Sequence, residues 1–171
     1  GNLLVATSET TNMAHFIDTA SHTIIDNVLV DSRARVAEFT PDGSQVWVSA
    51  EIGGKVTVID PKTRKILAKI GFEILGVNPD AIQPVGVRIT RNGKTAFVAL
   101  GPANRVAVID TTTFKVEKYL LVGQRVLGEH DRSGDVLAAI DDVRGLQPLG
   151  VQPPHVGGQQ LFQLRRREPG L

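Results

Sequence analysis

Hydrophobic and polar positions follow a strand-like pattern over short runs in the middle of the chain. Three runs rich in β-branched and aromatic residues are QVWVSAE at 45–51, KVTVID at 55–60 and KILAKI at 65–70. Turn sequences separate them: PDG at 41–43, GG at 53–54 and PKT at 61–63. This pattern predicts antiparallel strands joined by hairpins. Val46 and Val48 point to one face and Trp47 to the other, so we expect these strands to be covered on both faces.

The pattern is repeated along the chain, with an aspartate as its marker. When Asp18, Asp60 and Asp110 are placed in register, similar residues coincide without gaps over 18 positions. The coinciding sets are Gly1, Gly43 and Gly93; Val5, Trp47 and Phe97; Phe16, Val58 and Val108; and Ile17, Ile59 and Ile109. The spacings of 42 and 50 residues are typical of propellers and solenoids. We therefore predict an all-β fold, a β-propeller fragment of about three four-stranded antiparallel blades.

The longer spacing contains an insertion, GFEILGVNPDAIQP at 71–84, ahead of the strand VGVRIT. Its Gly, Asn, Pro and Asp residues indicate a loop, which we expect on one rim of a blade. Loops at such rims often carry function, but propeller loops also simply vary in length.

The repeat fades after Val126, which divides the chain into two predicted regions. Residues 1–126 form a partial β-propeller of about three blades, and residues 127–171 form a divergent tail. One hypothesis is that this tail arises from a shifted reading frame; from residue 147 onward it is rich in Pro, Gly and Gln, and we expect that part to be poorly ordered. The alternatives are a fourth blade that has diverged, or a helix beginning near 131–137. Since three blades cannot close a ring, we expect the chain to be an internal part of a longer protein.

Composition narrows the possible partners. Lys and Arg number 19 against 18 for Asp and Glu, so the net charge of +1 gives no general attraction to nucleic acid. The chain has no cysteine, which excludes disulfides and thiolate chemistry. No run reaches the roughly 18 apolar residues that a membrane helix requires. We expect neither a nucleic-acid partner nor a membrane span.

Catalytic and metal-binding patterns are not found in the sequence. The four histidines do not cluster with carboxylates at metal-ligand spacing, and no nucleophile elbow, zinc-protease or phosphate-loop motif occurs. We predict no catalytic and no metal-binding residues. The repeated Asp18, Asp60 and Asp110 are better explained by hydrogen bonds to the backbone of the turn that follows each of them.

Charged residues that do not repeat in all three copies are the best candidates for a binding site. They are Glu9, Arg33, Arg35, Glu51 and Arg88. Glu9 and Glu51 share a template position, which Gly101 occupies in the third copy. We expect the candidates near one rim or in a central channel, where propellers usually bind ligands. The alternative for each is an ordinary solvated surface residue.

Several segments resemble a known family. VWVSAEIGGKVTVIDPKT and FVALGPANRVAVIDTTT are similar to YVTN-type β-propeller repeats. SETTNMAHFID, LVDSRAR and ALGPANRVAVID more narrowly resemble the bacterial β-propeller proteins associated with PQQ-dependent alcohol catabolism. The resemblance extends from about residue 2 to residue 126.

The resemblance implies a non-enzymatic binding or accessory protein of the periplasm. It implies no cofactor in this chain itself, with PQQ involved indirectly through a partner enzyme. The implied partner is a quinoprotein dehydrogenase or a cytochrome. The alternative is a propeller enzyme, such as a lactonase or a quinoprotein dehydrogenase subunit, because similar repeats occur in such enzymes.

Overall fold

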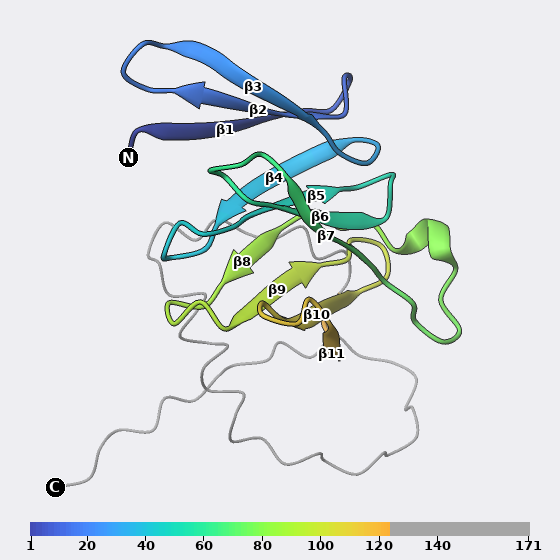
Figure 1. Cartoon of the computed structure of the whole chain (residues 1–171). Helices are drawn as coiled ribbons and strands as arrows, with labels where there is room; N and C mark the ends of the chain where they lie inside the picture. The colour runs from blue at the N-terminus through green and yellow to red at the C-terminus, as the bar shows by residue number, and fades with distance from the viewer. Residues whose placement is uncertain (124–171) are drawn as a thin grey trace, which may run out of the picture. The chain divides into compact units, whose positions relative to one another are not determined.

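Three antiparallel sheets follow one another along the chain in the computed structural model, which describes residues 1–123 (Figure 1). The first sheet contains β1 (Leu3–Ser8), β2 (Met13–Asp18) and β3 (Thr23–Leu29). The second contains β4 (Ala34–Phe39), β5 (Val46–Ala50), β6 (Lys55–Ile59) and β7 (Ile66–Gly71). The third contains β8 (Val87–Ile89), β9 (Thr95–Ala99), β10 (Arg105–Asp110) and β11 (Val116–Leu121). A short 3₁₀ helix, η1 (Pro79–Ala81), precedes β8.

Strand pairing confirms the repeat that the sequence predicts. Residues that share template positions face each other in all three sheets; these pairs are Val5 with Phe16, Trp47 with Val58, and Phe97 with Val108. A β-bulge follows the second member of each pair, at the step to Ile17, Ile59 or Ile109. Each sheet is a meander of neighbouring strands, as in the blades of a β-propeller. The predicted all-β propeller architecture is therefore confirmed, with three strands in the first sheet and four in each of the others. The predictions for residues 127–171 lie outside the described residues.

The core lies between the sheets. Val46 and Val48 pack with the first sheet, whereas Trp47 packs with the third, as the alternation of apolar positions predicts. Trp47 is fully buried and its Nε1 donates a hydrogen bond to Oε1 of Gln45 at 2.8 Å. A buried hydroxyl also joins two sheets, since Ser49 Oγ donates to the carbonyl of Val85 at 2.6 Å. The second sheet thus has both faces covered.

One turn residue in each of two sheets reaches back to the preceding sheet. Arg64 places its guanidinium 4.7 Å from the ring centre of Phe16, and Phe114 lies 6.1 Å from Trp47 between ring centres. Arg64 and Phe114 both lie four positions after a template aspartate and both have positive φ. These contacts add aromatic and cation–π attraction to the apolar packing between neighbouring sheets.

The antiparallel meander creates two distinct ends. Because strand direction alternates, the turns after β1, β5 and β9 share one end with the connections after β3 and β7; we call this end the connection rim. The other end carries the three turns that begin at Asp18, Asp60 and Asp110, and we call it the aspartate rim. No helix among residues 1–123 is long and apolar enough to cross a membrane.

Template aspartates fold the turns of the aspartate rim. In each turn Oδ1 accepts two backbone N–H groups: from Ala20 and Ser21 to Asp18, from Lys62 and Thr63 to Asp60, and from Thr112 and Thr113 to Asp110, at 2.7 to 3.2 Å. Hydrogen bonds from the backbone, together with the Thr63 or Thr113 hydroxyl, lower the pKa of Asp60 and of Asp110. The predicted structural role of these aspartates is confirmed.

Candidate functional site

Four of the five candidate residues meet at the connection rim. Glu9 lies in the β1–β2 turn, Arg33 immediately before β4, Arg35 within β4, and Glu51 in the β5–β6 turn. The Nε of Arg33 is 3.1 Å from Oε2 of Glu9 and 3.3 Å from Oε2 of Glu51. Arg35 forms an ion pair with Glu9 as well, and its Nε lies 3.3 Å from the same Glu51 oxygen. We call these four residues the charge network.

Local backbone geometry holds the charge network in place. Arg33 has a φ of 61°, a left-handed conformation that is uncommon outside glycine, and its N–H donates to Oδ1 of Asn12 at 2.9 Å. Its carbonyl accepts from the N–H of Glu51 at 2.9 Å. Gly53 allows this close approach, because a Cβ there would lie 2.5 Å from Cβ of Asp31. The arginine positions are therefore fixed by backbone contacts as well as by charge.

Glu51 is the inner member of the network. Its side chain is only 17% exposed, and among the described residues its Oε2 is shielded from solvent without a hydrogen bond. The positive charges of Arg33 and Arg35 on either side compensate this buried oxygen. Glu9 is about half exposed and closes the network on the solvent side. Two arginines and two glutamates give the network no net charge.

A second ion-pair group, which sequence reasoning missed, links the β3–β4 connection to the second sheet. Asp31 lies in the β3–β4 connection, with Oδ2 2.9 Å from Nζ of Lys69 and Oδ1 3.6 Å from Nζ of Lys55. Burial raises the pKa of Asp31, but the hydrogen bond from Lys69 and the charges of both lysines outweigh it, so the pKa is lowered overall. One signal was present in the sequence: Asp31 and Glu73 are both acidic residues thirteen positions after a template aspartate.

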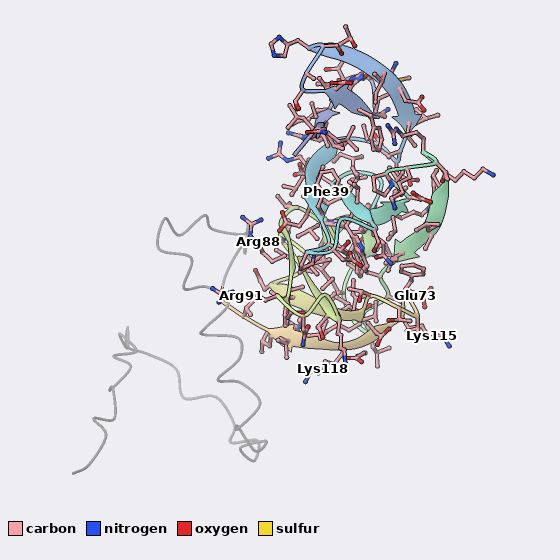
Figure 2. The ribbon with its side chains drawn as sticks, turned by 60° about the vertical axis from the view of Figure 1, so that its left-hand side comes forward. Phe39, Glu73, Arg88, Arg91, Lys115 and Lys118 are labelled. Atoms are coloured by element: carbon pink, nitrogen blue, oxygen red, sulfur yellow. The ribbon has the colours of Figure 1, made fainter. Side chains whose placement is uncertain are left out.

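Arg88, the fifth candidate, is not part of the charge network. It lies on β8, and its Nη1 donates to Oε2 of Glu38 on β4 at 2.9 Å. The two residues connect the first strands of the second and third sheets. In Figure 2 Arg88 and Glu73 lie on opposite sides of the ribbon.

A pocket of about 440 Å³ opens at the connection rim beside the charge network. One wall is the β5–β6 turn from Glu51 to Gly54, and the other is formed by Phe72 and the 79–83 segment. The predicted insertion at 71–84 therefore forms one side of a hollow at the rim, as a loop that contains η1. Glu51 belongs to both the pocket and the charge network.

Metal and histidine chemistry add little to this site. Within residues 1–123, no group of three or more histidine, aspartate or glutamate side chains is placed to hold a metal ion. His15 hydrogen bonds through Nδ1 to Oδ1 of Asn27 on the neighbouring strand. The connection rim combines a hollow with charged side chains that are held in fixed positions.

Comparisons with known proteins identify the fold. No protein-family model matches the chain, and no curated protein matches its sequence. Among solved structures, hydrazine synthase of Kuenenia stuttgartiensis is similar with a TM-score of 0.66 and 23% identity, over 73% of this chain and 34% of that chain. The dihydro-heme d1 dehydrogenase NirN, solved in complex with DHE, is similar with a TM-score of 0.57 and 16% identity, over 70% of this chain and 24% of that one. Both are β-propeller proteins, and the described part of this chain has the same fold.

Proposed function

We propose that this chain belongs to a non-enzymatic β-propeller of the bacterial periplasm that binds a partner at its connection rim. The proposed context is PQQ-dependent alcohol catabolism, and the proposed partner is a quinoprotein dehydrogenase or a cytochrome. The resemblance of SETTNMAHFID, LVDSRAR and ALGPANRVAVID to propellers associated with that catabolism supports the context. In this proposal PQQ stays in the partner enzyme, and the propeller carries no cofactor of its own.

One observation carries the binding role: four of the five candidate residues that break the repeat gather at one rim. The charge network, the insertion and the pocket all lie at the connection rim. The aspartate rim, in contrast, uses its carboxylates to fold its own turns. Residues that the repeat does not need for folding are the ones available for recognition.

The fixed charges of the network support a binding role. Glu9 and Glu51 each face two guanidinium groups, so the four side chains hold one another in place. The same fixed charges give an interface a defined orientation and register.

Isolation of the intact protein from its native cells tests this proposal. Cells grown on an alcohol should yield the propeller together with a quinoprotein dehydrogenase or a cytochrome, in a constant ratio through size-exclusion chromatography. A monomer with no partner under the same inducing conditions would contradict the proposal.

Activity and metal assays test the alternative that the protein is an enzyme. The purified protein should hydrolyse no lactone and should contain no stoichiometric metal after dialysis. Lactone turnover that rises with a bound metal would replace the binding role with an enzymatic one.

A further inference from the structure

The insertion between β7 and β8 is held firmly to the core rather than projecting loosely. Phe72 and Ile82 are both buried, and Ile74 and Val77 pack against the same cluster. The N–H of Glu73 donates to the hydroxyl of Tyr119 on β11 at 3.1 Å. The insertion is therefore attached to both the second and the third sheets. A surface that is already ordered loses little conformational freedom when a partner binds.

The second half of the insertion passes close to two glycines, Gly54 and Gly101. A Cβ at Gly54 would lie 3.6 Å from the carbonyl oxygen of Ile82, and one at Gly101 would lie 3.1 Å from that of Gln83. Asn78 caps the start of η1, because its Oδ1 accepts a hydrogen bond from the N–H of Asp80 at 3.0 Å. These contacts fix the wall of the pocket, since backbone atoms rather than flexible side chains meet there.

One apolar residue of the insertion does not follow this inward packing. Leu75 is fully exposed, although its neighbours Ile74 and Val77 both pack inward. A second exposed apolar residue is Ile52, which lies in the β5–β6 turn at one wall of the pocket and is 59% exposed. Single exposed apolar residues are common on proteins. Here Ile52 lines the pocket, which gives an incoming side chain a place to enter, and Leu75 lies in the insertion between the lining residues Phe72 and Pro79.

The charge of the insertion indicates the chemistry of the partner. Residues 71–87 include Glu73 and Asp80 but no lysine or arginine. The arginines at the neighbouring charge network are engaged with Glu9 and Glu51, and Lys55, which follows the lining residue Gly54, is paired with Asp31. The charged residues of the insertion itself are thus acidic, which favours a partner that carries positive charge.

We propose that the insertion and the β5–β6 turn form a docking surface for a partner-protein segment with an apolar side chain between lysines or arginines. The apolar side chain enters the pocket beside Ile52, Leu75 contacts the partner from the insertion, and the basic residues lie toward Glu73 and Asp80. This inference deepens the proposed function and depends on it for the identity of the partner. It depends on the geometry of the rim alone for the chemistry of binding.

Titration of the full 171-residue chain with short peptides tests the docking chemistry by NMR. The first peptide has a central Leu-Phe pair between two Lys-Lys pairs. In the second peptide serine replaces the Leu-Phe pair, and in the third glutamate replaces the lysines. The first peptide should give saturable shifts of backbone amides at Ile52 and in residues 72–83 at concentrations of about 1 mM or below. Equal shifts from the serine peptide, shifts located elsewhere, or no saturable shift would overturn the inference.

Matched variants identify the contacts. Leu75→Ser should weaken the first peptide by about tenfold, because it removes a leucine that becomes buried on binding. Ile24→Ser is the control, because Ile24 is 58% exposed but lies at the start of β3, near the aspartate rim. The control should bind as the unmodified chain does. Equal affinity of Leu75→Ser and the unmodified chain would remove Leu75 from the surface and contradict the proposal.

The same variants separate this inference from the proposed function. If the native dehydrogenase or cytochrome copurifies equally with the intact protein and its Leu75→Ser variant, the function stands and the docking surface is wrong. If the peptide binds at the insertion but no such partner copurifies, the docking chemistry stands and the proposed function is wrong.

Discussion

The sequence repeat is kept at one rim of the sheets and broken at the other. At the aspartate rim all three copies use the same aspartate, the same pair of backbone donors and a left-handed residue four positions later. At the connection rim the copies diverge: Gly101 stands in the third copy where the first two have Glu9 and Glu51, and the connection from β7 to β8 is much longer than the one from β3 to β4. The comparison indicates that the repeated positions specify the blades, whereas the charge network and the insertion depart from the repeat at one rim.

The largest predicted effect is a loss of stability on substitution of a glycine at the connection rim, compared with the same substitution at the aspartate rim. Gly53→Ala should lower the free energy of unfolding by about 3 kcal/mol, because its Cβ would lie 2.5 Å from Cβ of Asp31 and 2.8 Å from the backbone nitrogen of Ser32. Gly43→Ala should cost only about 1 kcal/mol, because its φ of 69° is strained for alanine but the space is open. Urea denaturation measures both. Equal losses would contradict the tight contact at the connection rim.

Acid should weaken the turns of the aspartate rim. The hydroxyl of Thr40 and the N–H and hydroxyl of Ser44 lower the pKa of Asp42 to about 2, and the pKa of Asp60 and of Asp110 is lowered by similar bonds. A lowered carboxyl pKa stabilises the fold at neutral pH. The stabilisation is lost as pH falls from the usual aspartate pKa of 3.8 toward about 2.

Thermal melts at several pH values between 6 and 2 measure this loss. The unmodified chain should lose stability steadily below about pH 4, and Asp110→Asn should show a shallower loss from a lower starting melting temperature. Salt is the control, because short hydrogen bonds persist when salt screens long-range charge. An unchanged acid profile in Asp110→Asn would show that the turn bonds contribute nothing.

A smaller effect is expected from the charge network. A double-mutant cycle of Glu9→Gln and Arg35→Gln should give a coupling energy of about 0.5 kcal/mol, since both side chains are partly exposed. The coupling should shrink in roughly 1 M NaCl, because salt screens exposed charges. A coupling that is zero, or one that is unaffected by salt, would mean that the pair is not an ion pair in solution.

The smallest effect is expected at Leu75. Because this side chain is fully exposed, Leu75→Ser should change the free energy of unfolding by less than about 0.5 kcal/mol. The same substitution is expected to weaken peptide binding, so stability and recognition separate at this position. A large loss of stability would show that Leu75 packs within the protein and is not available to a partner.

The sequence predicted most of the fold because the repeat records it three times. Each template position faces the same kind of neighbour in every copy, so a residue pattern that occurs in all three copies reflects the fold rather than chance. The predicted sidedness of Trp47 and the structural role of Asp60 both follow from period and turn chemistry, and both are confirmed. Strand bounds are set by bulges and turns that recur at the same template positions.

The site was less predictable because its parts occur once or come from different copies. The sequence marked Glu9 and Glu51 as unusual but could not show that Arg33 and Arg35 lie between them. Their meeting depends on the left-handed backbone at Arg33 and on the close approach at Gly53, neither of which a strand pattern reveals. The inward packing of the insertion was also not evident, because its apolar residues follow no strand or helix period.

The central claim is that the three sheets stack face to face as propeller blades, because both rims depend on that stacking. Contacts between the sheets test this claim most directly. Nuclear Overhauser effects should be measured between the rings of Trp47 and Phe114, whose centres lie 6.1 Å apart, and between Arg64 and the ring of Phe16. The account predicts clear cross-peaks for both pairs, together with the strand registers within each sheet. Correct strand registers without either cross-peak would mean that the hairpins lie side by side in one layer, and that result would contradict the account.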